Sequence, residues 1–402
     1  MEVRLATFDE VRDAFRQKDL KQSLYDEGGV VMAGVLLTLH GDEHRSRRRL
    51  ENRLFRRDTF RRYEHDLVAD IISGTLAPFV AGGRADLVQV AYRVIMNLTA
   101  LIAGLDRAGT VEETESLLRY TKLFSVGATL AHSTRDHDEV RAEVAAGLAE
   151  FDAEFLRPSV ERRRKLLDQV AAGALAEDAL PPDVLTTLLR NEDDLDLPPD
   201  LILREVAFYL QAGSHSTANA FTHTMHELFG WGAAHPDDLG RARADRLFLQ
   251  RCSHEALRLY PASPVALRVA LAPVRLRTGR EIGAGDAVVL DLMAANRDPA
   301  VFGADAAAFN PRRPLPDGVA PWGHSFGGGT HACIGAELDG GLDPAQTRDD
   351  PATHLFGTVT TLAAAVLDAG VRLDPDRAPV LDPDTSRPHF GSYPVIFESA
   401  LP

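Results

Sequence analysis

The sequence contains very little cysteine, with two residues in 402, Cys252 and Cys333. Two thiols are too few for the disulfide framework that stabilises small secreted domains. We also find no signal peptide and no long uncharged apolar run, so no segment is predicted to cross a membrane. These absences predict a protein of the reducing cytoplasm that has no membrane anchor.

Positive charge is also in short supply. Lysine and arginine total 44 against 59 aspartate and glutamate residues, which gives a formal net charge of -15. Because nucleic-acid binding needs a concentrated basic surface, this balance argues against nucleic acid as the main partner. Hydrophobic residues at 45% and charged residues at 26% provide ample material for a core, so disorder is not the default. The length alone leaves the number of domains open.

The pattern of apolar residues predicts a chain rich in helices. Residues 66–167 have nearly continuous helical spacing, residues 171–199 form a linker, and a long helix runs from about residue 200 to about residue 229. Another helix is predicted over residues 247–260. Residues 265–290 instead predict short strands separated by glycine turns.

The second cysteine lies in a glycine-rich segment that precedes a predicted helix start. The spacing F-x-x-G-x-H-x-C-x-G is formed by Phe326, Gly329, His331, Cys333 and Gly335. Glycines let the backbone pass close to a large flat group, and a single thiolate can hold a metal cofactor. A cysteine in a glycine-rich loop is weak support by itself, because a small buried thiol is the commoner outcome. All five positions in register make a specific signature.

This segment resembles the haem-binding signature of the cytochromes P450 at every specified position. The resemblance implies that Cys333 is the axial ligand of the iron of haem b, with Phe326, Gly329 and Gly335 beside the cofactor. It implies a mainly α fold with a small β region in a single domain, residues 1–402, shortened at the N-terminus. Residues 339–350, which are rich in Gly, Asp and Pro, are then predicted to be an insertion after the start of the cysteine helix.

Two short motifs occur before the cysteine in the order typical of the family. Glu255 and Arg258 form E-x-x-R, and Arg313 ends an F-x-P-x-R motif. An acid and an arginine at i, i+3 on a surface helix stabilise the helix by only about 0.2–0.5 kcal/mol. The resemblance implies instead a buried Arg-Glu-Arg network that fixes the loop carrying Cys333 and is costly to break.

A basic stretch, residues 41–62, stands out in this acidic chain. His44 and Arg48 are four residues apart and share a face of a predicted helix. By resemblance they bind the haem propionates together with Arg268 and His331. The remaining arginines predict an exposed basic face. A merely solvated surface is the plain interpretation, and the resemblance favours a docking patch for an acidic ferredoxin or flavodoxin.

The long predicted helix contains a glycine and several hydroxyl residues at its centre. Such residues destabilise and bend helices, because hydroxyl groups can bond back to carbonyls, and they predict a groove. The segment resembles the oxygen-binding segment of the family, A-G-x-acid-Thr-Thr. The resemblance places Ala212 and Gly213 beside the cofactor and Ser216 at the position of the first threonine, with Thr217 next to it.

The acid position of that segment holds His215, which replaces a carboxylate by a group with a pKa near ~6.5. By resemblance, Ser216, His215 and Thr217 are the catalytic residues that manage protons and water on the distal side. Two alternatives stay open: His215 packs in the groove and relays nothing, or it ligates the iron directly.

The resemblance implies a monooxygenase that hydroxylates, epoxidises or similarly oxidises a small organic substrate, hydrophobic or derived from a natural product. It would use O2 and electrons from NAD(P)H delivered by a separate ferredoxin or flavodoxin system, and we expect a monomer. The missing acid at position 215 leaves open a peroxide-using or non-monooxygenase P450. A haem-binding or ligand-binding protein without turnover is the alternative from another class.

Overall fold

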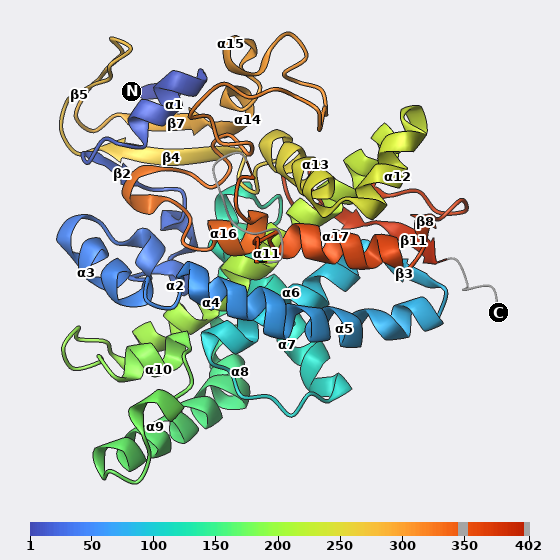
Figure 1. The fold of residues 1–402 in the computed structure, drawn as a ribbon. Helices are drawn as coiled ribbons and strands as arrows, with labels where there is room; N and C mark the ends of the chain where they lie inside the picture. Colours follow the sequence, from blue (N-terminus) through green and yellow to red (C-terminus); the bar gives the residue numbers. More distant parts are fainter. Residues whose placement is uncertain (345–352, 398–402) are drawn as a thin grey trace.

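The computed structural model describes residues 1–344 and 353–397 (Figure 1). Helices make up most of this part of the chain, as the apolar spacing predicts. The α-helices are α1 Phe8–Ala14, α2 Gly29–Met32, α3 Gly41–Glu51, α4 Arg57–Arg62, α5 Ala69–Ala81, α6 Leu87–Ala103, α7 Val111–Ala128, α8 His137–Phe151, α9 Arg157–Ala171, α10 Val184–Leu189, α11 Pro199–Ala234, α12 Pro236–Ala244, α13 Arg246–Leu259, α14 Leu292–Ala295, α15 Pro299–Phe302, α16 Ala336–Gly340 and α17 Thr358–Asp368.

The strands are short and form small sheets. They are β1 Glu2–Leu5, β2 Leu20–Gln22, β3 Arg84–Asp86, β4 Val265–Ala270, β5 Val274–Arg275, β6 Glu281–Ile282, β7 Ala287–Asp291, β8 Val371–Leu373, β9 Val380–Leu381, β10 Phe390–Ser392 and β11 Pro394–Phe397. The largest sheet has the order β1-β7-β4-β2, in which β1 is parallel to β7 and the other pairs are antiparallel. The mainly α fold class with a small β region is therefore confirmed.

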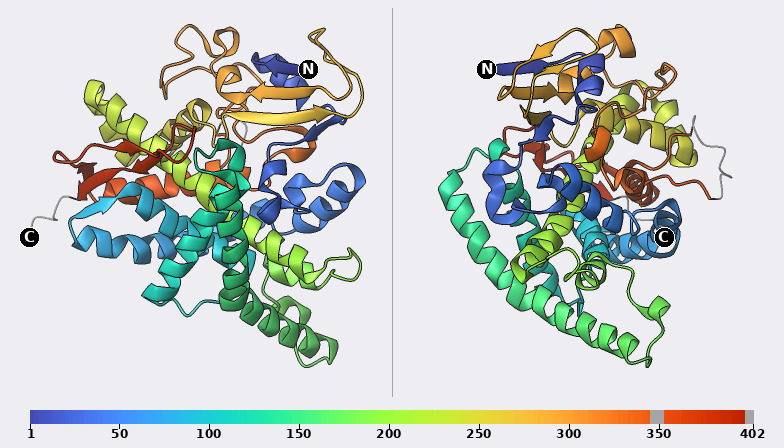
Figure 2. Two further views of the ribbon diagram at one scale, coloured as in Figure 1. Left: turned by 180° about the vertical axis from the view of Figure 1, so that it is seen from behind. Right: turned by 90° about the vertical axis from the view of Figure 1, so that its left-hand side faces the viewer.

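Helix α11 passes through the middle of the molecule, while the four-stranded sheet lies at one end with the N-terminus (Figures 1 and 2). The helix begins with Pro199, which is favourable in the first turn because its missing N–H has no helical partner there. Its 36 residues span about 54 Å at 1.5 Å per residue. It packs most extensively against α6. The helix runs from Pro199 to Ala234 and is longer than the sequence pattern predicts.

Two apolar cores flank the region where the functional residues gather. The larger core joins α6, α7, α8, α11, α13 and α17, and a smaller core lies between the four-stranded sheet and α1. A cavity is lined from both sides, by Leu98 and Phe208 of the larger core and by Phe15 and Leu292 of the smaller one. The fold thus holds the cavity at the junction of its helical part and its sheet.

Two sequence predictions need correction or limits. The predicted linker at residues 171–199 contains α10, whose first turn is capped by Asp183 accepting a hydrogen bond from the Thr186 amide at 2.7 Å. A six-residue helix is too short to show periodicity.

The predicted insertion at residues 339–350 falls partly on residues 345–350, which lie outside the described part of the chain. Within the described part, α16 ends at Gly340 and α17 begins at Thr358.

No helix among residues 1–344 and 353–397 is long and apolar enough to cross a membrane.

Candidate functional site

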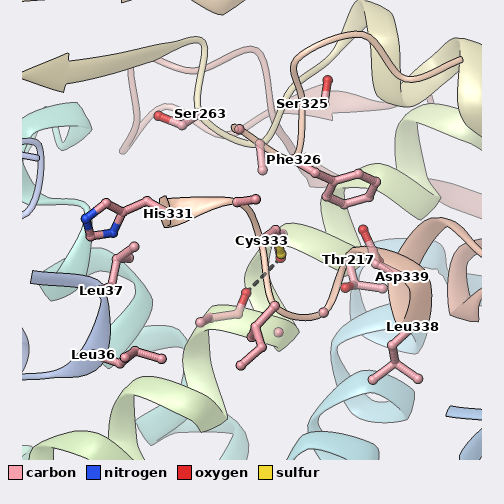
Figure 3. Close-up of a pocket in the computed structure, with 18 of the residues that line it drawn as sticks. Leu36, Leu37, Thr217, Ser263, Ser325, Phe326, His331, Cys333, Leu338 and Asp339 are labelled. Carbon is pink, nitrogen blue, oxygen red and sulfur yellow. Dashed lines mark hydrogen bonds between the residues drawn. The ribbon is translucent and has the colours of Figure 1, made fainter. Parts of the chain in front are cut away.

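The cavity measures about 340 Å³ and separates α11 from the segment that carries Cys333 (Figure 3). Its wall is mainly apolar, and polar groups occur at a few places. The predicted site residues that line it are His44, Arg48, Ala212, Gly213, Ser216, Thr217, Arg268, Phe326, His331, Cys333 and Gly335. The structure therefore brings together residues that lie almost 300 positions apart in the sequence.

Cys333 lines the cavity and is accessible in this structure, although protein surrounds the thiol closely. Its amide donates a hydrogen bond to the Phe326 carbonyl at 2.9 Å, which closes the glycine-rich loop. From α3, Arg48 Nη2 donates to the carbonyl of Ala332 at 2.8 Å and holds the same loop from the side. Burial raises the pKa of the Cys333 thiol to about 11. A bound metal cation reverses such a shift, because it deprotonates a coordinating thiol.

The glycines of the loop have different reasons for being glycine. Gly329 has a positive φ of 64°, and a Cβ there would overlap the Phe15 carbonyl oxygen at the end of α1. Gly329 does not line the cavity. Gly335 does line the cavity, and a Cβ there would meet no described atom within 4 Å. One glycine thus permits close backbone packing and the other keeps space open.

Four basic or imidazole groups meet at one part of the cavity wall: His44, Arg48, Arg268 and His331. The rings of His44 and His331 lie 4.1 Å apart between centroids. Burial, followed by the effect of His44, lowers the pKa of His331 to about 3. Burial also lowers the pKa of Arg268 to about 10. These groups form a basic cluster in the cavity wall. Among the described residues, no carboxylate forms an ion pair with Arg268.

These residues fit a haem group. Nε2 of His44 and Nδ1 of His331 are buried and lack a hydrogen-bond partner within the described chain. Arg268 is 7% exposed, and among the described residues its Nη1 donates to the carbonyl of the adjacent Leu267. Two propionate carboxylates would supply the missing acceptors and charge. The thiol of Cys333 supplies the ligand for iron, and the apolar wall suits the macrocycle.

On the opposite wall, α11 shows the hydroxyl back-bonding that the sequence predicts. Ser216 donates to the carbonyl of Ala212 at 2.7 Å, so its oxygen remains free to accept from a group in the cavity. Gly213 lines the cavity, but a Cβ there would collide with Thr99 of α6. The close packing of α6 on α11 therefore requires this glycine, in addition to any contact with a cofactor.

His215 does not line the cavity. Its Nδ1 lies 2.6 Å from the hydroxyl of Tyr92 on α6, and its ring packs 5.2 Å from that of His389. Burial, and then the charge of Arg387, keep the pKa of His215 well below its usual value, so the ring is neutral near pH 7. Nε2 is buried and has no partner among the described residues. Because His215 does not line the cavity, its position argues against direct ligation of the iron. Any proton transfer through Nδ1 of His215 would involve the Tyr92 hydroxyl.

Glu255, Arg258 and Arg313 form the compact network that the motifs predict. Both oxygens of Glu255 accept from Arg258 at 2.7 Å, and Oε1 also accepts from Arg313 at 3.1 Å. Asn296 connects the network to the cysteine segment, because its side chain donates to the Arg258 carbonyl and to Ser325 Oγ and accepts from the His324 amide. The network thus stabilises the segment just before Phe326.

Sequence reasoning missed two polar residues at the site. Asp339 of α16 lines the cavity next to Thr217 (Figure 3). Burial raises the pKa of Asp339 to about 6. Tyr92 pairs with His215 from another helix, so no local pattern marks it. For Asp339 the available signal was an acid only six positions after Cys333.

The basic stretch divides into buried and exposed parts. Arg47 is 4% exposed and pairs with the fully buried Glu205 at 2.9 Å, so it does not belong to the predicted basic face. The exposed arginines of the stretch are Arg45, Arg49, Arg53, Arg56, Arg57 and Arg62. Arg57 pairs with Glu337 of α16.

A helical fold in which one thiol lines a cavity beside a cluster of basic groups fits a haem-thiolate protein. Residues 240–338 match the sequence model of the family described as Cytochrome P450. A cyclooctat-9-en-7-ol 5-monooxygenase of Streptomyces melanosporofaciens is 27% identical over 80% of this chain and 74% of its own length. A C-19 steroid 1alpha-hydroxylase of Sorangium cellulosum is 27% identical over 77% of this chain and 71% of its own.

Solved structures agree in fold. A myxobacterial cytochrome P450 in complex with myristic acid has a TM-score of 0.73 and 22% identity, covering 98% of this chain and 90% of its own. A P450 of Bacillus megaterium in complex with testosterone has a TM-score of 0.71 and 17% identity, over 98% and 93% of the two chains. In sequence and in fold the chain is similar to the cytochromes P450, and the matched residues 240–338 include Cys333 and the network of Glu255, Arg258 and Arg313.

Proposed function

We propose that this protein oxidises a small hydrophobic or natural-product substrate with O2 and electrons that a separate ferredoxin or flavodoxin system carries from NAD(P)H. The observation that carries the proposal is the position of Cys333, whose thiol faces an apolar cavity beside the basic cluster. The bound haem would supply oxygen activation, favoured by the electron density of an anionic sulfur ligand. Relatives named for a cyclooctatenol and for C-19 steroids support a bulky apolar substrate.

In this proposal each wall of the cavity has a separate task. Cys333 ligates the iron, and His44, Arg48, Arg268 and His331 bind the propionates. Phe326 and Gly335 border the cofactor on the cysteine side, and Ala212 and Gly213 border it on the side of α11. The chain acts as a single domain and a monomer in the cytoplasm.

The spectrum of the reduced protein with carbon monoxide tests the haem-thiolate assignment. We expect a strongly red-shifted Soret band in the wild type, because only thiolate ligation produces it. The variant Cys333→Ser should lose this band even if it still retains haem. Cys252→Ser is the matched control, since this second thiol is fully buried on α13 and lies outside the cavity. A red-shifted band that survives Cys333→Ser would contradict the assignment.

Ser216, Thr217 and His215 would handle protons and water on the side of α11. Because Ser216 lines the cavity and His215 lies behind it, we expect Ser216→Ala to lower the fraction of electrons recovered in product more than His215→Ala does. Tyr92→Phe should resemble His215→Ala, since it removes the hydroxyl of the same pair. Coupling that is unchanged in His215→Ala and in Tyr92→Phe would rule out a relay through this pair.

The neutral His215 at the usual acid position also favours a second candidate, a P450 that uses peroxide. Turnover with hydrogen peroxide alone, compared with turnover using a ferredoxin system, separates the two. A substrate-induced spectral change with no product under either supply would indicate a binding protein without turnover.

Electron delivery is proposed to occur at the exposed arginines of α3, of α4 and of the segment between them. These residues lie near α16, since Arg57 pairs with Glu337, and α16 directly follows the cysteine segment. An acidic electron carrier would be steered there by complementary charge, mainly through its association rate. We expect Arg53→Glu with Arg56→Glu to slow reduction at low ionic strength and to leave the spectrum with carbon monoxide unchanged.

A further inference from the structure

A buried arginine lies next to the cavity and is not used by the proposed function. Arg387 is 6% exposed and lies in the segment between β9 and β10. Its Nε donates to Thr385 Oγ1 at 3.2 Å, its Nη2 donates to Thr129 Oγ1 at 3.1 Å, and its Nη1 reaches the carbonyl of Ala262 at 3.5 Å. All three acceptors are neutral.

The charge of Arg387 has no counterion in the described part of the chain. A guanidinium has five N–H donors, so at least two of them lack a protein acceptor here. Burying a charge is unfavourable unless it is paired, and the nearest titrating groups do not offer a negative charge. His132, His215 and His389 all have pKa values lowered by burial, and the charge of Arg387 lowers them further, so these rings are neutral. Asp382 acts on Arg387 only at a distance, without an ion pair.

Arg387 lies directly behind the cavity wall. Ala262, which accepts its longest hydrogen bond, lines the cavity together with Ser263 (Figure 3). Ser263 Oγ is also 3.2 Å from His132 Nε2, so this corner is polar. Tyr25 lines the cavity and is close enough for the charge of Arg387 to affect its pKa. The 3.5 Å contact to Ala262 is the longest of the three, so it is the one that a ligand in the cavity would most readily replace.

Arg387 is not one of the four groups assigned to the propionates, and Tyr25 lies near both Arg387 and Arg268 of that cluster. The groups that influence His331 are His44, Arg268, His40 and Arg48, and Arg387 is not among them. Arg387 instead influences His215, which lies behind α11. Among the described residues, Arg387 is therefore a buried cation without an ion pair, and it lies behind Ala262 of the cavity wall.

We propose that Arg387 binds the carboxylate of the substrate, so that the natural substrate is an apolar organic acid. One guanidinium balances one monoanion, whereas a dianionic phosphate would call for further cations that this corner does not offer. The apolar wall takes the rest of the molecule. The proposal rests on the proposed function, since it assigns the substrate of the same cavity.

Binding of matched acids and amides to the haem-loaded protein tests the proposal. The probes are octanoate, dodecanoate and 4-phenylbutanoate, each compared with its primary amide, which has the same shape without the charge. Dissociation constants are measured by calorimetry and by the Soret shift. We expect at least one acid to bind about tenfold more tightly than its amide, because the charge-assisted hydrogen bond is lost in the amide.

Variants assign the preference to Arg387. Arg387→Gln should bring the ratio of acid to amide affinity close to one, whereas Arg387→Lys, which keeps the charge, should retain part of it. Arg135→Gln is the matched control, because this arginine is nearby but already pairs with Glu143 at 2.7 Å.

Equal affinity for each acid and amide in the wild type, no binding of any acid, or a preference that survives Arg387→Gln would overturn the proposal. The spectrum with carbon monoxide is recorded for every variant. It reports the haem-thiolate assignment independently, so failure of the substrate proposal is distinguishable from failure of the proposed function.

Discussion

Two buried guanidinium groups of this protein have opposite surroundings. Arg258 is 0% exposed, and Glu255 holds it with two hydrogen bonds of 2.7 Å, while the carbonyl of Ala306 accepts a further bond. Arg387 is almost as buried at 6%, yet contacts two hydroxyls and one carbonyl. Glu255 neutralises the charge of Arg258 within the fold. The charge of Arg387 has no counterion among the described residues, and we assign it to the substrate carboxylate.

Around Arg47 the imbalance is reversed, because two buried carboxylates lie near one guanidinium. Arg47 pairs with Glu205. Glu51 accepts a hydrogen bond from Tyr209, and its Oε1 has no partner in the described chain. Burial raises the pKa of Glu51 to about 7, against the lowering effects of Tyr209 and Arg47. Here a carboxylate can remove its own excess charge by binding a proton. Arginine cannot lose its proton in this way, which is why an unpaired one points to a ligand.

The largest effect is expected from breaking the neutralised network. Arg258→Met should lower the free energy of unfolding by about 3–5 kcal/mol, because it leaves part of the Glu255 charge buried and unmatched. Haem retention should fall as well, since Asn296 links Arg258 to the segment before Phe326. Chemical unfolding and haem content are the measurements. A loss below about 1 kcal/mol would show that the network is dispensable.

An intermediate and pH-dependent effect is expected at Glu51. Its folded-state pKa of about 7 lies above the ordinary value, so the folded protein binds the proton more tightly than the unfolded chain. Stability should therefore fall as pH rises through the interval from about 4.5 to 7, by an amount on the order of 1–3 kcal/mol.

Glu51→Gln should remove this part of the pH dependence, which unfolding at pH 5 and pH 8 would show. The same substitution at Glu112, an exposed carboxylate on α7, is the control and should leave the slope unchanged. A slope that is the same in Glu51→Gln as in the wild type would contradict the assignment. The charge of Glu51 also raises the pKa of Glu205, so Glu51→Gln changes the titration of both groups.

The smallest effect on stability is expected at Arg387. Arg387→Met loses hydrogen bonds to neutral groups but also relieves a buried charge, so the free energy of unfolding should change by less than about 1 kcal/mol. The comparison with Arg258→Met uses the same substitution at two equally buried sites. A loss as large as that of Arg258→Met would mean that Arg387 is structural and would weaken the case for a bound carboxylate.

The sequence determined the parts of the site that depend on spacing along the chain. Phe326, His331, Cys333 and Gly335 lie in one loop, and His44 and Arg48 are one helical turn apart, so local geometry alone places each group. The mainly α fold also follows from the helical period of long apolar stretches. Helix α10, which lies inside the predicted linker, was missed because its six residues are too few to display a period.

Tertiary structure decided what lies across the cavity from each of these residues. Gly213 is glycine because Thr99 of α6 packs against it, and Gly329 because of the carbonyl of Phe15. The direction of His215, toward Tyr92, depends on how α6 crosses α11. The missing counterion of Arg387 is visible only when every neighbour is known, since neutralisation of a buried charge is a property of the whole environment and not of any sequence pattern.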